Sequence, residues 1–145
     1  MVDDILAAGR RSMECLRAVR QLPDAQLRAD VLEPMLQQAI EAKWRLPPSG
    51  EKNIYRLAVQ SIRRQDAAVR QLPPEALRRA VEKYDCHQTT LVAKKKTLLF
   101  LYMESALGVH LEDAEAAAVE TVPQLAGRLA ARLAEVRAAE REAPK

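Results

Sequence analysis

The chain has 145 residues, a formal net charge of +3 and a composition that is 48% hydrophobic but only 3% aromatic. Its many Ala, Leu, Arg, Glu and Gln residues are helix formers, and strand-length runs of β-branched and aromatic residues are missing, so the sequence predicts one all-α domain. The two cysteines are isolated, which excludes a disulfide scaffold, and no apolar run approaches the ~20 residues of a membrane span. The acidic N-terminus is unlike a secretory signal, so we expect a cytoplasmic protein.

The N-terminal part of the sequence predicts two helices joined by a short turn. Apolar residues recur at helical spacing over residues 3–22, and Pro23 ends that pattern. Asp24 is placed to cap a second helix that continues to the only tryptophan, and Pro34 inside this helix should kink or split it. The stretch 46–50, which contains two prolines and a glycine, is predicted to be a loop.

The middle of the chain predicts three further helices. The first covers residues 51–72, and the prolines at 73–74 start the next one. The polar stretch 85–90 is expected to connect that helix to another over residues 90–107. Six consecutive apolar residues, 98–103, give the last of these helices an apolar side in every direction. We therefore expect it to be buried on all sides by other helices.

The C-terminal part carries local signals for helix ends. Gly108 suits a helix C-cap in the left-handed region, and Asp113 is placed to cap a short helix. Thr121 and Gln124 have the spacing of a capping box, which predicts the start of a last helix. Residues 138–145, which are only Ala, Glu, Arg, Pro and Lys, are expected to form a frayed tail.

One internal repeat is visible, because the sequence of residues 18–23 recurs without change at residues 68–73. Each copy reads Ala-Val-Arg-Gln-Leu-Pro, a helix end followed by a proline stop, so two similar helix hairpins are implied, at about 10–46 and 60–101. We expect residues 1–137 to form a single-domain bundle of five to seven helices, in which these two pseudo-repeated hairpins surround the buried helix.

Chemistry-bearing residues are few. Only one cluster in the sequence combines metal-binding and nucleophilic side chains, and it consists of Asp85, Cys86 and His87, together with His110. The spacing of these residues matches no zinc site and no complete catalytic set. The four glycines are far apart, so no phosphate-binding loop is present. We expect residues 85–87 to lie in a solvated turn, and we expect no enzymatic activity, metal or cofactor.

Basic residues outnumber acidic ones in the first part of the chain. Residues 1–103 carry 18 Lys and Arg against 12 Asp and Glu, a balance of +6, while residues 104–145 carry 5 against 8, a balance of −3. An acidic partner such as nucleic acid is thus one alternative, and a solvated helical surface is the other. The candidate contacts are Lys52, Arg56, Arg63, Arg70, Lys94, Lys95 and Lys96.

Apolar stripes are more numerous than one core obviously needs, which is typical of helices that associate with other helices. We therefore expect a non-enzymatic binding or assembly protein, with a protein partner or a second copy of the chain. These residues equally fit the core of a monomer, and the alternative stays open. The candidate interface residues are Leu32, Leu36, Ile40, Trp44, Leu129, Leu133 and Val136.

The C-terminal third contains the run Leu107-Gly-Val-His-Leu-Glu-Asp113, followed by Ala116 and Val119, and then by Thr121-Val122 with Leu125. On these residues, the segment 93–136 resembles the second half of an acyl carrier protein. In that family the second helix begins with the serine that receives 4′-phosphopantetheine, and the ungapped register places this serine at Ala93, which has no hydroxyl. The resemblance therefore implies a carrier-like helical fold without its prosthetic group, and convergence on a common way of capping three helices is the alternative.

Overall fold

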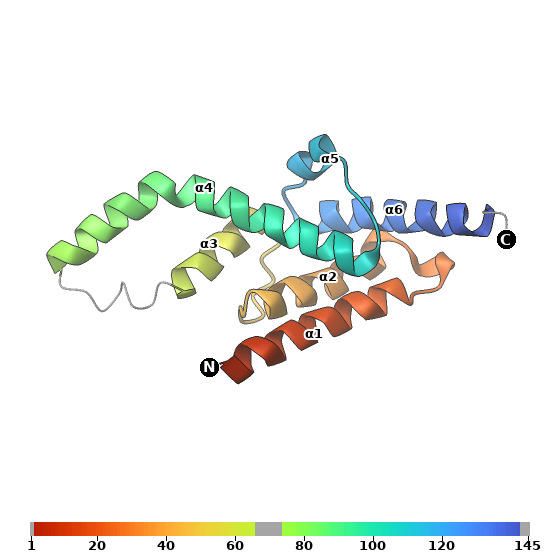
Figure 1. Ribbon diagram of the computed structural model, residues 1–145, viewed down its shortest axis with the longest axis horizontal. Helices are drawn as coiled ribbons and strands as arrows, with labels where there is room; N and C mark the ends of the chain where they lie inside the picture. The colour runs from red at the N-terminus through yellow and green to blue at the C-terminus, as the bar shows by residue number, and fades with distance from the viewer. Residues whose placement is uncertain (1, 66–73, 143–145) are drawn as a thin grey trace.

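The structure of the protein is a computed structural model, shown in Figure 1. It describes the backbone of residues 2–65 and 74–142, and the side chains of residues 5–64 and 91–142. Within these ranges the fold is entirely helical and contains no strand, which confirms the predicted all-α bundle. Its elements are α1 (Val2–Arg20), a 3₁₀ turn (Asp24–Gln26), α2 (Ala29–Lys43), α3 (Ile54–Gln65), α4 (Pro74–Leu107), α5 (Asp113–Ala118) and α6 (Val122–Glu142).

Helices α1 and α2 form the first predicted hairpin, and α2 lies between α1 and α6 (Figure 1). The fully buried residues Leu16 and Val19 of α1 recur at helical spacing and belong to the same apolar core as α2. Pro34 does not split α2, which continues to Lys43, because a proline near a helix start removes only one backbone hydrogen bond. α2 is therefore covered on two sides by helices of the same chain.

The turn between α1 and α2 differs from the prediction. Asp24 does not cap α2, because residues 24–26 first form a 3₁₀ turn and α2 begins only after Arg28. The Asp24 carboxylate instead accepts hydrogen bonds from Arg137, at 2.9 Å, and from Arg141 of α6. The position of Asp24 just before a helix thus did not determine its role, because its carboxylate is bonded to two guanidinium groups that are distant in the sequence.

Helix α4 is one continuous helix, so the predicted connection at residues 85–90 is wrong. No Gly or Pro occurs between Pro74 and Gly108, and polar residues alone do not stop a helix. The expected central helix at 90–107 is therefore the second half of α4. Helix α4 as a whole packs against α3. The expected extension of α3 over residues 66–72, and the second copy of the repeat at 68–73, lie outside the described residues.

The predicted caps around α4 and α6 are confirmed. Gly108 has a φ of 69°, and its N–H and that of Val109 both donate to the Glu104 carbonyl, at 2.8 and 3.1 Å. The Thr121 N–H donates to the Gln124 side-chain oxygen at 3.1 Å, and the Gln124 N–H donates back to Thr121 Oγ1 at 3.4 Å. These hydrogen bonds satisfy backbone groups that a helix end leaves without partners.

The C-terminal elements differ from the prediction at two points. The N-cap of α5 is Glu112 and not Asp113, and the Glu112 N–H donates to Glu115 Oε1 at 3.3 Å. The predicted frayed tail is helical up to Glu142, because Arg137 and Arg141 hold this part of α6 against Asp24. Residues 143–145 lie outside the described part of the chain.

A short antiparallel bridge ties the start of α3 to the start of α6. Asn53 pairs with Thr121, the Ile54 N–H donates to the Glu120 carbonyl at 2.9 Å, and the Val122 N–H donates to the Lys52 carbonyl at 2.8 Å. The Asn53 side chain also accepts the Arg56 N–H at 3.0 Å, which is why α3 begins at Ile54. The two helix starts are therefore fixed relative to each other by backbone hydrogen bonds.

Candidate interaction face on helix α4

The second half of α4 is buried on one side only, so the expected burial on all sides is wrong. Leu99 and Met103 are 2% and 1% exposed, whereas Leu98 is 58% and Leu101 is 55% exposed. Leu91, two turns before Leu98 on the same side, is 41% exposed. We refer to Leu91, Leu98 and Leu101 as the α4 leucine stripe. The apolar residues that predicted complete burial thus cover both a buried and an exposed side.

The leucine stripe is unusual among the exposed residues. The other large apolar side chains that are exposed in the described part of the chain are Ile5, Leu6 and Tyr55, which lie on α1 and α3. Single exposed leucines are ordinary on a protein surface, but several in one row along a helix are typical of an association surface. A helix that is apolar all round is also typical of one covered on every side. The stripe is therefore the best candidate for a surface that a partner covers.

The three consecutive lysines of α4 do not form one basic patch, because successive helical residues point in different directions. Lys94 is exposed on the side of the leucine stripe. Lys95 Nζ lies 5.4 Å from the centre of the Trp44 ring, and Lys96 Nζ lies 5.4 Å from that of Phe100. Burial lowers the pKa of both Lys95 and Lys96 from the ordinary lysine value. Only Lys94 is therefore placed for contact with a partner.

The other predicted basic contacts are also dispersed. Lys52 Nζ lies 3.2 Å from Glu33, and Arg56 lies 3.5 Å from Glu51, so each has an acid of the same chain beside it. Arg63 is exposed on α3, and Arg70 lies outside the described residues. Two of the candidate basic contacts are therefore paired with acids of the same chain.

The predicted apolar interface on α2 and α6 is part of the core of the single chain. α2 packs against both α1 and α6, so its wide apolar face is covered from two sides. Val136 is half-buried against the same cluster. The other six are at most 7% exposed: Leu32, Leu36, Ile40, Trp44, Leu129 and Leu133. These side chains are therefore not accessible to a partner in this structure.

The predicted chemistry-bearing residues are not brought together. Residues 86–87 are in α4, not in a turn, and their side chains lie outside the described residues. His110 follows the other end of α4, roughly 30 Å farther along the helix axis, at 1.5 Å per residue. Within residues 5–64 and 91–142, no three His, Cys, Asp or Glu side chains gather closely enough to hold a metal ion.

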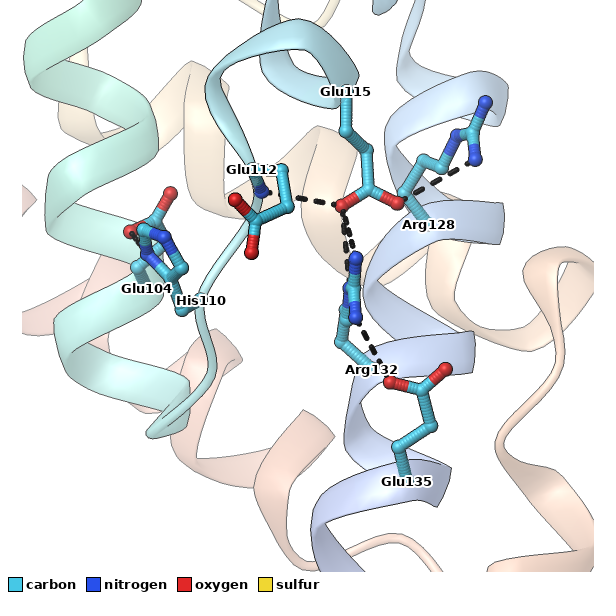
Figure 2. A network of polar contacts seen from close by, with 7 residues as sticks. All are labelled: Glu104, His110, Glu112, Glu115, Arg128, Arg132 and Glu135. Atoms are coloured by element: carbon cyan, nitrogen blue, oxygen red, sulfur yellow. Dashed lines mark hydrogen bonds and ion pairs between the residues drawn. The ribbon is translucent and has the colours of Figure 1, made fainter.

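His110 instead lies beside a carboxylate of α4, and a separate set of polar contacts surrounds α5 nearby, as Figure 2 shows. His110 Nδ1 lies 3.3 Å from Glu104 Oε2. On the other side, Glu115 accepts hydrogen bonds from Arg132 at 2.8 Å and from Arg128 at 3.4 Å (Figure 2). The hydrogen bond from Arg132 holds the pKa of Glu115 below its usual value. The contacts of Glu115 join the short α5 to α6, which is a structural role.

Ala93, where the carrier family has its modified serine, is an exposed residue in the middle of α4. Its carbonyl accepts a hydrogen bond from Thr97 Oγ1 at 2.9 Å. In the carrier family the serine stands at the start of a helix, whereas α4 begins at Pro74, well before this position. The surroundings of position 93 thus depart from the family pattern in backbone as well as in side chain.

None of the helices in the described part of the chain combines the length and the apolar character needed to cross a bilayer. Comparison of the chain with protein-family models, with curated proteins and with solved structures gives no match. The surfaces of the chain itself, and above all the α4 leucine stripe, are therefore the basis for assigning a function.

Proposed function

We propose that the chain is a non-enzymatic helical binding module whose α4 leucine stripe docks an amphipathic helix of a partner protein. The observation that carries this proposal is the contrast within α4, where Leu98 and Leu101 are more than half exposed although Leu99 and Met103 are buried. A helix in this position gains stability when its exposed leucines are covered, since burial of a leucine side chain contributes ~1.5–3 kcal/mol. Docking of a second helix supplies such cover.

The charge on the stripe favours an acidic partner helix. Lys94 stands between Leu91 and Leu98 on the exposed side, and it has no ion-pair partner among the described residues. Glu104, the acid of this half of α4, lies against His110. A partner with leucines at helical spacing, flanked by Asp or Glu, would therefore match both the apolar row and the positive charge.

The size of the stripe favours a reversible contact. Three leucines and their neighbours form a small surface, at the low end of specific interfaces, which bury less than about 1,200 Å² in total. Permanent dimers bury more than this. A transient partner protein is thus favoured over a second copy, and self-association remains an outcome of the test.

Two synthetic helical peptides test the proposal by fluorescence anisotropy, one with leucines and glutamates and one with leucines and lysines at the same positions. We expect tighter binding of the acidic peptide, and we expect Leu98→Glu to weaken that binding about 10- to 100-fold. Leu6→Glu is the matched control, because Leu6 is also 58% exposed but lies on α1.

Equal weakening by Leu98→Glu and Leu6→Glu would contradict the proposed site, and equal affinity for the two peptides would contradict the acidic partner. Light scattering of the free chain gives the third outcome. A dimer that Leu98→Glu dissociates would assign the stripe to self-association instead.

The other two functions have less support. Nucleic-acid binding would require a continuous basic surface, but Lys52 and Arg56 are paired with acids. A carrier function would require a hydroxyl for phosphopantetheine at Ala93, so we expect no mass gain on treatment with a promiscuous transferase. A cytoplasmic location fits the free thiol of Cys15.

A further inference from the structure

A cleft of about 780 Å³ lies between α1, α2, α3 and the loop that follows α2. This volume is in the range of small-molecule sites, roughly 300–1,000 Å³. Its apolar wall comes mainly from the loop, and its polar groups come from all three helices and from Arg45 of the loop. The lining residues that matter here are Arg11 of α1, Glu41 of α2, Trp44, Arg45 and Pro47 of the loop, and Ser61 and Arg64 of α3.

Three arginines converge on this cleft from three elements. Arg11, Arg45 and Arg64 are exposed, and none of them has an ion-pair partner among the described residues. The one acid of the lining, Glu41, is buried and accepts hydrogen bonds from the Ser49 N–H at 3.1 Å and from Gln37 at 3.4 Å. The cleft therefore carries more positive than negative charge, and such a cleft attracts anions.

Ser61 is the strongest sign that the cleft has an occupant. Its side chain is only 1% exposed, it lines the cleft, and its hydroxyl has no hydrogen-bond partner among the described residues. A buried hydroxyl without a partner is costly, and natural proteins keep few of them. A ligand that accepts a hydrogen bond from Ser61 would remove this cost.

Arg45 gives an independent indication. It has a φ of 54°, in the left-handed region where glycine is the usual residue after a helix. Its N–H donates to the Ala42 carbonyl, and the Leu46 N–H donates to the Glu41 carbonyl at 2.8 Å, so the backbone here is a helix C-cap. Glycine would make the same cap without strain, and strained residues cluster at binding sites. An arginine at this strained position, with its side chain lining the cleft, is thus a second feature that points to a ligand.

We propose that this cleft binds an organic anion, a phosphate monoester or a carboxylate joined to an apolar body. Arg11, Arg45 and Arg64 hold the anionic group, and the Ser61 hydroxyl donates a hydrogen bond to it. The apolar body packs against Trp44 and Pro47. Cys15 also lines the cleft, and burial raises the pKa of its thiol, which disfavours a thiolate beside the anion.

Trp44 provides a direct readout, since it is the only tryptophan of the chain and lines the cleft. We expect phenyl phosphate to change its fluorescence saturably, and we expect no saturable change with benzyl alcohol, which lacks the anion. Arg11→Gln and Arg64→Gln should each weaken phenyl phosphate binding about 10-fold or more, as for the loss of a charge-assisted hydrogen bond. Arg10→Gln is the matched control, because Arg10 is exposed on α1 but does not line the cleft.

Ser61→Ala separates binding from folding. The variant should bind phenyl phosphate more weakly than the wild type and yet unfold at a higher urea concentration, because it removes a buried hydroxyl that has no partner in the described part of the chain. A purely structural serine would not give this combination.

Three results would overturn the proposal. The first is the lack of a saturable response to phenyl phosphate, when urea titrations show that the wild type and the variants are folded. The second is equal binding by the Arg10→Gln, Arg11→Gln and Arg64→Gln proteins. The third is equal affinity for inorganic phosphate and phenyl phosphate, which would remove the apolar body from the assignment.

Discussion

The Tyr102 hydroxyl donates a hydrogen bond to Ser12 Oγ over 3.1 Å, and so joins α4 to α1. Ser12 is fully buried, and its own hydroxyl donates to the Ala39 carbonyl of α2 at 2.8 Å. The Lys43 ammonium lies 4.3 Å from the centre of the Tyr102 ring. One serine thus connects three helices, and a buried polar chain of this kind is costly to break.

We expect Ser12→Ala to lower the free energy of unfolding by ~1–3 kcal/mol, because the Ala39 carbonyl and the Tyr102 hydroxyl both lose a partner. Urea denaturation followed by circular dichroism measures the change. Ser105→Ala on the exposed side of α4 is the control and should change stability by less than ~0.5 kcal/mol. Equal effects of the two substitutions would mean that the buried connection contributes nothing.

Adjacent leucines of α4 should respond in opposite ways to the same substitution. Leu99→Ala should lower the free energy of unfolding by ~2–5 kcal/mol, because it creates a cavity in the core. Leu98→Ala should change it by less than ~0.5 kcal/mol, because Leu98 is mostly exposed in the single chain. Urea denaturation at low protein concentration distinguishes the two, and a large loss from Leu98→Ala would show that this side of α4 is covered.

The contact of Asp24 with α6 predicts a pH dependence. Hydrogen bonds from Arg137 and then from Arg141 lower the pKa of Asp24 in the folded state. The contribution to stability is therefore complete above the pKa of the unfolded chain, about 3.9, and is lost as the pH falls through the lower folded value.

Urea midpoints between pH 2 and pH 7 test this expectation, with Asp24→Asn as the variant. The difference from the wild type should be constant above about pH 5 and should shrink steadily as the pH falls below the pKa of the unfolded chain. Glu140→Gln, an exposed change on the same helix, is the control. A difference that persists unchanged at pH 2 would rule out the ionised carboxylate as its source.

The two left-handed helix ends predict opposite effects of exchanging glycine. Gly108→Ala should cost ~1–2 kcal/mol of stability, because φ is 69° at this position. Arg45→Gly should gain about 0.5–1 kcal/mol, because φ is 54° and glycine adopts it without strain. Arg45→Ala separates the causes, since it removes the side chain but keeps the strain. A gain from Arg45→Ala as large as that from Arg45→Gly would show that the side chain, and not the backbone, is destabilising.

Features that depend on neighbouring residues were predictable from the sequence. The Gly108 cap and the hydrogen bonds between Thr121 and Gln124 involve groups only a few residues apart, so their spacing is sufficient. The continuity of α4 through residues 85–90 could also be predicted, because no Gly or Pro interrupts this stretch and polar residues alone do not end a helix. The three consecutive lysines of α4 point in different directions, which follows from the helical period alone and could also be predicted from the sequence.

Features that depend on distant parts of the chain were not predictable in this way. The apolar pattern of α4 indicates how much surface should be buried, but not which side its neighbours cover. The role of Asp24 depends on arginines more than 100 residues away. Arg45 and Ser61, which define the proposed anion site, have no local signal, because one depends on a backbone angle and the other on a missing partner.

The position of α2 between α1 and α6 has a consequence for biosynthesis. Leu36 and Ile40 of α2 are fully buried, and α6 begins only at Val122. During translation the ribosome releases α1 and α2 long before α6. The apolar side of α2 that α6 covers therefore stays exposed until residues 122–142 emerge. We expect chaperones that recognise unfolded nascent chains to bind this apolar surface before α6 emerges.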